Sequence, residues 1–431
     1  MHLRKITGAL VLAALGAGRG GADEPAQRTA VAKCVTPTGS ILRREAPDKP
    51  WQLVKEGETL YSGDLLLGMS GAALDGRDGA VRLTFVSDPT GSSPLPILET
   101  AVVLGNSKDV DFDFFLERGR VDFANQKNKE QARVRARIRK DGAGAVIVAE
   151  PGAQASLSVL GRWPAGVPFV KKPKPDHAPA LSLIFLVLKG EVGIHLDGRY
   201  FAMAAPPGPA FVAWDSIGGG DRTPQRLEKL PDWVHTEGNP EAVKRKQILG
   251  EFRQLVLTKD LGAALDEFAV SNDSLKRRLA VYAMGALDDL KRLGTVLASA
   301  KHADTWDHAV RAMRHWIGRG PDQDLRLYNA LIKEANFTER DAESVLQLLH
   351  SFGEDQLSRP ELYEVLIDFL DHDKLALRGL AHWHLVRLVP AGRKIAYNPT
   401  DSKEARAKAI EQWKELIPPG KLPPSPKVED K

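Results

Sequence analysis

The spacing of apolar residues changes near residue 220, and this change constrains the fold more than any other feature of the sequence. From about Val35 to Ser216, short runs alternate apolar and polar residues or end in "DG", "RG" or "KG", which is typical of strands and turns. From about Pro224 to Ile417 the pattern is that of helices of about ten to fifteen residues separated by polar turns. These patterns predict three segments: an all-β domain at 35–216, a linker at 217–223 and a helical domain at 224–417.

The first residues of the chain have the pattern of an export signal. Arg4 and Lys5 precede an apolar run from Ile6 to about Ala17, and small residues follow it. This order is typical of a secretory signal peptide, and the run is too short to span a bilayer comfortably. We therefore expect a signal peptide at 1–22 and an extracytoplasmic protein, periplasmic or secreted. An uncleaved anchor and a buried N-terminal helix are the alternatives.

The composition argues against nucleic-acid binding, an intrachain disulfide and a later membrane span. Sixty basic and 56 acidic residues leave a formal charge of +4, which is too small for this length to predict nucleic-acid binding. Cys34 is the only cysteine, so no intrachain disulfide is expected. No later apolar run approaches ~20 residues, so we expect no transmembrane span after signal cleavage. The proline-rich, polar segment at 418–431 is predicted to be a disordered tail.

Two short stretches carry charges of opposite sign at alternate positions. In "DVDFDFF" these are Asp109, Asp111 and Asp113, and in "RVRARIR" they are Arg133, Arg135, Arg137 and Arg139. Period two puts charged and apolar groups on opposite faces of a strand. Both stretches are therefore predicted to be half-buried strands of one antiparallel assembly.

The four arginines, Arg133, Arg135, Arg137 and Arg139, are the candidate binding residues of the sequence. Guanidinium groups spaced about 6.6 Å apart along a strand suit a polyanion such as an acidic polysaccharide, a phosphate polymer or a nucleic acid. A solvated strand face is one alternative. Pairing with the aspartates on a neighbouring strand is the other, and we favour it because the two stripes are near in sequence, with equal period and opposite sign.

The helical half repeats itself loosely. Residues 280–284 are "AVYAM" and residues 309–313 are "AVRAM", and "RRLAVYAMGAL" aligns with "RGLAHWHLVRL". An irregularly recurring helical hairpin is typical of an α-solenoid of the HEAT type, whose period is about 40 residues. Two capping signals, Thr338 before "AESVLQLL" and Asp401 before the last helix, predict where helices begin.

One helical stretch has the residue types of a metal or hydrolase site. "DHDKLALRGLAHWHL" holds two aspartates and three histidines. His382 and His384 are two residues apart and point about 200° away from each other on a helix, so they do not chelate one ion together. The repeat alignment places His384 on the packing face, and Asp371 and Asp373 in the turn that caps the next helix. We predict a structural role, with no metal and no cofactor.

Three motifs in the β half carry a family resemblance. "GETLYSGDLLL", "DGAVRLTF" and "LERGRVDF" resemble the FecR-type domain of bacterial extracytoplasmic proteins, with these residues at the family's turn and strand positions: Gly57, Gly63, Asp64, Asp78, Gly79, Gly119 and Val121. With its helical half, nearly the whole mature chain is similar to exported planctomycete-type proteins that join a FecR domain to helical repeats. FecR-type proteins relay a signal from an outer-membrane receptor to a cytoplasmic sigma factor, so the resemblance implies a regulator. Because the signal lies at the extreme N-terminus, with no cytoplasmic segment before a span, we expect only the sensing or docking role to carry over.

The sequence shows no catalytic signature. It has no HExxH, no GxSxG, no phosphate loop ending in GKS or GKT and no glycine fingerprint after a strand. We expect a non-enzymatic exported interaction or scaffold protein, whose β domain docks or senses and whose helical repeats bind an envelope or secreted protein partner. A polyanion or glycan is a second ligand class. The alternatives are an extracytoplasmic hydrolase acting on glycans and an envelope signalling regulator of FecR type.

Overall fold

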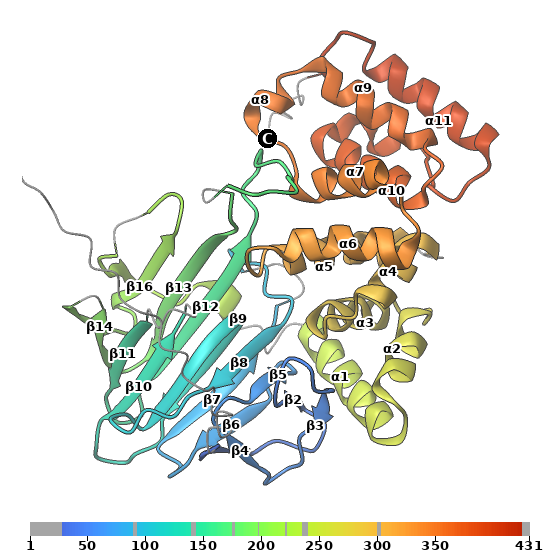
Figure 1. Cartoon of the computed structure of the whole chain (residues 1–431). Helices are drawn as coiled ribbons and strands as arrows, with labels where there is room; N and C mark the ends of the chain where they lie inside the picture. Colours follow the sequence, from blue (N-terminus) through green and yellow to red (C-terminus); the bar gives the residue numbers. More distant parts are fainter. Residues whose placement is uncertain are drawn as a thin grey trace, which may run out of the picture.

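The chain folds into a sheet-rich region followed by a helical region, as the change in apolar spacing predicts (Figure 1). The computed structural model describes residues 28–88, 93–138, 144–174, 177–196, 198–219, 222–234, 240–299 and 303–424. The predicted signal peptide at 1–22, Arg139 and the end of the predicted tail lie outside these residues. No helix within them is long and apolar enough to cross a membrane.

The strands of the described residues have the following bounds: β1 (Ala30–Cys34), β2 (Ile41–Arg44), β3 (Gln52–Leu53), β4 (Thr59–Tyr61), β5 (Leu65–Gly68), β6 (Ala73–Gly76), β7 (Val81–Val86), β8 (Thr100–Leu104), β9 (Phe112–Asn125), β10 (Ala132–Arg137), β11 (Gly144–Ala149), β12 (Gln154–Arg162), β13 (Ala180–Lys189), β14 (Glu191–Leu196), β15 (Arg199–Ala204), β16 (Gly208–Asp215) and β17 (Gln225–Leu227).

These strands form two sheets that share β9. One sheet has the order β4-β1-β6-β7-β9-β12-β13-β16-β17. The other has the order β3-β2-β5-β8-β9-β10-β11-β14-β15. β9 passes from one sheet to the other at Gly119, whose φ is +93°. A Cβ atom at this position would lie 2.2 Å from the Glu99 carbonyl oxygen, so only glycine fits here. Side chains from both sheets, among them Phe85, Phe114 and Phe123, form one apolar core.

The pairing of β9 with β10 corrects the predicted antiparallel arrangement. The two strands are parallel, with Arg135 opposite Asp113. Side chains alternate with period two in both kinds of pair, so the spacing alone does not fix the direction. β9 begins at Phe112. Asp109 and Asp111 therefore lie in the preceding turn, and the prediction that they belong to the strand is wrong.

The sheet-rich region runs from Ala30 to Leu227 and is wider than the predicted 35–216. The predicted linker at 217–223 falls between β16 and β17, which pair with each other in one sheet. The chain therefore returns to the sheet after its glycine-rich turn and passes to the helices only after β17.

The helical elements have the following bounds: η1 (Asp232–Val234), α1 (Pro240–Thr258), α2 (Leu261–Ala269), α3 (Ser274–Ala286), α4 (Leu290–Ser299), α5 (Ala303–Ile317), α6 (Gln323–Ala335), α7 (Glu339–His350), α8 (Glu354–Leu357), α9 (Pro360–Asp368), η2 (Phe369–Asp371), α10 (Leu375–Leu388), η3 (Pro390–Lys394) and α11 (Lys403–Leu416).

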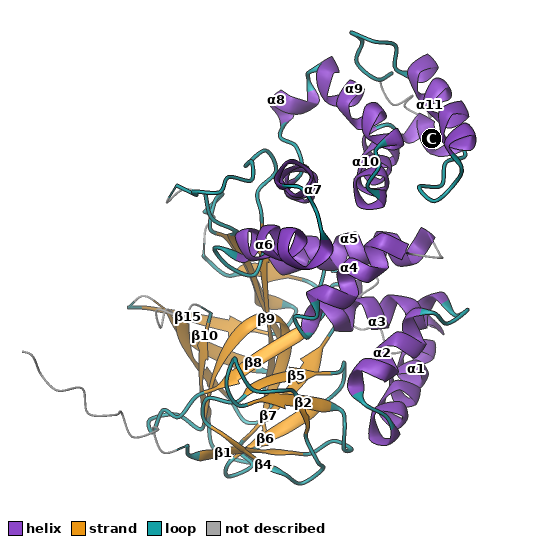
Figure 2. Cartoon of the chain, turned by 45° about the vertical axis from the view of Figure 1, so that its right-hand side comes forward, coloured by secondary structure: helices purple, strands orange, loops and turns teal. Residues whose placement is uncertain are grey.

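The helices stack along one side of the sheets and continue past their ends (Figure 2). α3 packs on α5, and α10 packs on α7 and α9. The recurring "AVYAM" and "AVRAM" lie in α3 and α5, where Val281 and Val310 are fully buried. The apolar residues that repeat in the sequence are therefore those that pack neighbouring helices together.

The predicted helix caps are confirmed in one case and corrected in two. Thr338 caps α7 as predicted, because its side chain accepts a hydrogen bond from a backbone amide of the first turn. α11 is capped by Ser402 instead of the predicted Asp401. Asp373 does not cap α10, since Lys374 is the N-cap residue and makes no capping bond through its side chain.

A buried ion cluster joins the two regions. The Glu99 carboxylate accepts hydrogen bonds from Arg118 of β9 and from Arg319, which follows α5. Arg319 also pairs with Asp288, with Nη1 and Oδ1 2.9 Å apart. Burial alone would raise the pKa of Glu99, but the two guanidinium groups lower it to about 2. His315 lies 3.7 Å from the same carboxylate, and burial lowers its pKa to about 4.

Candidate functional site

Two of the arginines on β10 form ion pairs with aspartates of the other charged stretch. Arg135 and Arg137 pair with Asp109 and Asp113, with nitrogen and oxygen 2.8 Å apart in both pairs. The side chain of Asp113 is buried, so Arg137 balances a charge that water does not reach. Arg133 is exposed. The structure therefore contains the pairing that the sequence favours over polyanion binding for two of the four arginines.

His384 has the packed position that the sequence predicts. It is buried, and its Nε2–H donates to the Leu348 carbonyl oxygen at 2.7 Å. That carbonyl is among the last four of α7, which have no partner within their own helix. Arg314 donates to the next one, the Leu349 carbonyl. Burial lowers the pKa of His384 to about 4, so near pH 7 it caps α7 as a neutral group.

The other polar residues of that stretch have separate partners. The His382 ring lies against Tyr397, with ring centroids 4.8 Å apart. Asp371 pairs with Arg406 at 2.9 Å. Across the ranges that the structure describes, no three His, Cys, Asp or Glu side chains gather where they would hold a metal ion.

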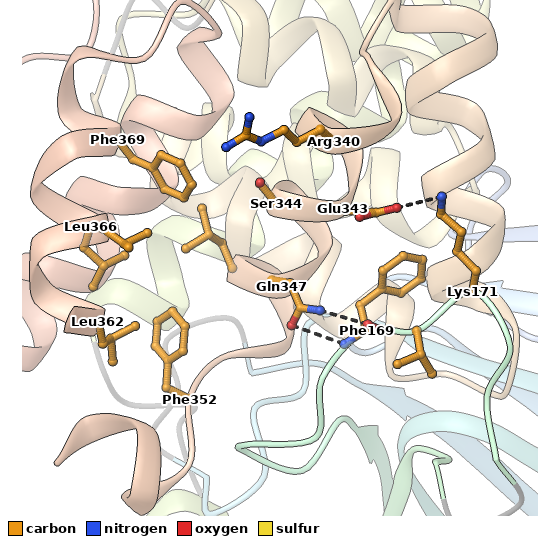
Figure 3. Close-up of a pocket in the computed structure, with 13 residues that line it drawn as sticks. Phe169, Lys171, Arg340, Glu343, Ser344, Gln347, Phe352, Leu362, Leu366 and Phe369 are labelled. Carbon is orange, nitrogen blue, oxygen red and sulfur yellow. Dashed lines mark hydrogen bonds and ion pairs between the residues drawn. The ribbon is translucent and has the colours of Figure 1, made fainter. Parts of the chain in front are cut away.

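An open groove lies between α7, α9 and residues 169–171, which belong to the connection between β12 and β13 (Figure 3). Its volume is about 500 Å³, which is in the range of small-molecule pockets. Sequence reasoning does not find this groove, because residues almost 200 positions apart form its walls.

One wall of the groove is apolar. Leu362, Val365, Leu366 and Phe369 recur at i, i+3, i+4 and i+7 along α9 and its end, and all four line the groove. Leu366 is fully buried, whereas 47% of Val365 is exposed. Phe352 lies beside Leu362 at one end (Figure 3). α9 therefore lines the groove with an apolar stripe that is most exposed at Val365.

The facing wall belongs to α7 and is polar: Arg340, Glu343, Ser344 and Gln347. The Gln347 amide binds both the backbone N–H and the carbonyl oxygen of Phe169, at 3.3 and 2.8 Å. Glu343 pairs with Lys171 at 2.7 Å. The side chains of Arg340 and Ser344 form no hydrogen bond and no ion pair with any residue in the described part of the chain.

The sequence of α9 does carry a signal of the groove. The stretch "LYEVLIDFL" at 362–370 has only two polar residues, whereas a helix that buries one face needs three or four apolar residues in two turns. Tyr363, Ile367 and Leu370 are buried in the helical core. Leu366 belongs to the same core, and Leu362 and Phe369 pack against it, so Val365 is the apolar residue of this stretch that stays exposed, at 47%.

This groove is the candidate functional site of the described residues, because it combines an apolar wall, exposed at Val365, with the side chains of Arg340 and Ser344, which have no partner there. Two smaller cavities, of about 100 and 70 Å³, lie at the joint with α3 and within the β region. Their walls are mainly apolar. In comparisons with known proteins, no protein-family model, no curated protein and no solved structure matches the chain.

Proposed function

We propose that the protein is a non-enzymatic, exported interaction protein that binds a protein partner in the groove between α7 and α9. The observation that carries this proposal is the apolar stripe of α9, which faces an open groove with 47% of Val365 exposed. Removing a side chain of this size from water stabilises a complex by about 1–2 kcal/mol. Arg340 and Ser344, on the facing wall, offer the same partner an ionic and a hydrogen-bonding group.

The helical region suits this role as an α-solenoid of the HEAT type. Its helices progress from α1 beside the sheets to α11 at the far end (Figure 1). Stacked helical repeats commonly offer extended surfaces to other proteins. The recurrence of one apolar motif on two helices that pack together, α3 and α5, supports this assignment.

The β region is proposed as a FecR-like docking or sensing domain at the cell envelope. Gly57, Gly63 and Gly79 have φ of +76°, +86° and +68°, which agrees with the turn positions that the resemblance gives them. The buried Asp64 carboxylate accepts the Tyr61 amide at 2.8 Å and fixes one of these turns. The extracytoplasmic location rests on the sequence pattern at 1–22.

Affinity capture from the native envelope tests this function. Val365→Asp places a charge in the apolar wall and is expected to reduce the recovery of the specific partner at least tenfold, since it replaces an apolar contact by a desolvated carboxylate. Val243→Asp is the matched control, because Val243 is 61% exposed on α1, away from the groove. It should recover the partner like the unchanged protein.

The proposal fails if quantitative proteomics finds the same proteins in the same amounts with Val365→Asp and Val243→Asp. Both variants should melt within about 2 °C of the unchanged protein, because substitutions at exposed positions have small effects on stability. A melting temperature lowered only by Val365→Asp would be separated from loss of contact by repeating the capture with Val365→Ser.

A further inference from the structure

One of the strands at the ends of the two sheets has a long free edge. The other three end strands, β3, β4 and β17, have only two or three residues each. β15 has six residues, and within the described part of the chain it pairs only with β14, without a bulge. It contains neither proline nor lysine, which commonly protect edge strands from pairing with another chain. β15 is therefore the sheet end best suited to accept a further strand.

The backbone groups of Tyr200 and Ala202 point to this free edge. The Ala205 N–H, just past the strand, donates to the Gly190 carbonyl oxygen at 2.9 Å, on the β14 side. Successive residues of a strand direct their N–H and C=O groups to opposite sides, so Tyr200 and Ala202 direct theirs away from β14. Both residues are exposed. Within the described residues, no backbone hydrogen bond links either of them to a strand other than β14.

The apolar interior reaches the surface beside the same edge. The cavity of about 70 Å³ in the β region is lined by Phe201 and Met203 of β15 and by Val212 of β16, among others. Phe201 and Val212 are only half-buried. β15 and β16 follow each other in the chain but form no ladder with each other. A strand added at the edge of β15 would therefore gain apolar contacts as well as hydrogen bonds.

We infer that β15 pairs antiparallel with β15 of a second copy of this chain, with Tyr200 opposite Ala202 of the other copy. This register uses the two exposed, outward-facing residues of each strand, and each such pair exchanges two N–H···O bonds. A register shifted toward the end of the strand would need Ala204. A Cβ at Gly208 would lie 3.0 Å from the Ala204 carbonyl oxygen, so the start of β16 takes up the space there.

The strand is complementary to itself in this register, which favours a second copy as the occupant. On the outer face, the large Tyr200, 60% exposed, lies opposite the small Ala202. On the inner face, Phe201 lies opposite its own equivalent. Arg199 is the only charged residue of β15 and lies opposite Met203. The two Arg199 residues are then about 14 Å apart along the strands, beyond the screening length of about 8 Å. A two-fold axis supplies both halves of this match from one surface.

Sedimentation equilibrium of the full-length protein over the micromolar range tests the pairing. We expect a monomer–dimer equilibrium. Ala202→Pro removes the N–H that the second strand needs and should raise the dimer dissociation constant at least about tenfold. The matched control, Ala202→Ser, keeps this N–H and should stay within about twofold of the unchanged protein. Because edge strands tolerate proline where the N–H faces solvent, Ala202→Pro should melt within about 4 °C of the unchanged protein.

Cysteine cross-linking tests the register. Chains with Tyr200→Cys and chains with Ala202→Cys should form an interchain disulfide when they are mixed, because the Cα atoms of a hydrogen-bonded antiparallel pair are about 5.5 Å apart. Either variant alone should cross-link at least about fivefold less, since equal residues are then diagonal neighbours about 7–8 Å apart. The native Cys34 is buried and does not compete.

Three results would overturn the inference: a monomer at every concentration, a dimer that Ala202→Pro leaves unchanged, or a higher cross-link yield from one cysteine variant alone than from the mixture. A monomer that takes up an extended segment of another protein at β15 would also overturn it. If Ala202→Pro melts more than about 4 °C lower, the cross-link decides alone. The inference goes beyond the proposed function and does not involve Val365, so its failure leaves partner binding in the groove untouched.

Discussion

Replacing Glu99 by glutamine is expected to lower the free energy of unfolding by about 3–5 kcal/mol, because two buried guanidinium groups lose the buried carboxylate that they share and keep only the more exposed Glu117 and Asp288. The Glu99 carboxylate binds both Arg118 and Arg319, and its side chain is only 5% exposed. Glutamine has nearly the same shape, so the loss reports charge and hydrogen bonding more than packing. Urea denaturation at pH 7, followed by tryptophan fluorescence and circular dichroism, measures it.

Glu117→Gln is the matched control for this prediction. Glu117 also pairs with Arg118, at 2.8 Å, but its side chain is 27% exposed. Removing this partly solvated pair should cost less than about 1 kcal/mol. Equal losses in the two variants would mean that the joint between the sheets and the helices does not depend on the buried carboxylate.

The second large effect is a loss of stability in mild acid. Burial lowers the pKa of four histidines to about 4: His308, His315, His382 and His384. An unfolded histidine binds a proton near pH 6.5, so between pH 6.5 and 4 the unfolded chain holds more protons than the folded one. The stability that these groups contribute is therefore complete above pH 6.5 and is lost as the pH falls toward 4. Each group accounts for at most about 3 kcal/mol.

Protonation of Glu99 lowers stability over a second, more acidic pH range. Its pKa is lowered to about 2 in the folded chain from a usual value of 4.5. Its contribution is present above pH 4.5 and is lost as the pH falls toward 2. The midpoint of urea denaturation should therefore decline further below pH 4.5, and Glu99→Gln should reduce the decline in this range.

Replacing His384 by leucine tests how much one of these histidines contributes to the pH dependence of stability. At pH 7 the variant should lose about 1 kcal/mol, because the Leu348 carbonyl at the end of α7 is left without its donor. Between pH 6.5 and 4 the variant should lose less stability than the unchanged protein, because it lacks one histidine that binds a proton more strongly in the unfolded chain than in the folded one. A pH dependence identical to that of the unchanged protein would mean that His384 does not titrate as its burial implies.

Much of the coarse fold follows from local patterns, because period two and helical spacing are properties of single segments. The β-then-α order and the buried position of His384 are of this kind. The partial pairing of the two charged stripes also follows, since opposite charges with equal period lie near each other in the chain. Thr338 is found because a capping side chain acts within its own first turn.

The features that local patterns miss depend on distant parts of the chain. The parallel pairing of β9 with β10 is such a feature, because alternation is the same in both directions. The return of the chain to the sheet at β17 is another, since a three-residue strand carries almost no pattern of its own. The groove needs α7, α9 and residues 169–171 together. Only the surplus of apolar residues around Val365 is visible in the sequence.

Photo-cross-linking in the native envelope tests the central claim most directly. A photoreactive amino acid at position 365 should form an adduct with a protein partner on illumination, and the same residue at position 243 should not. Adducts in equal yield at positions 365 and 243, or no adduct at 365, would contradict the claim that the groove between α7 and α9 is where this protein binds its partner.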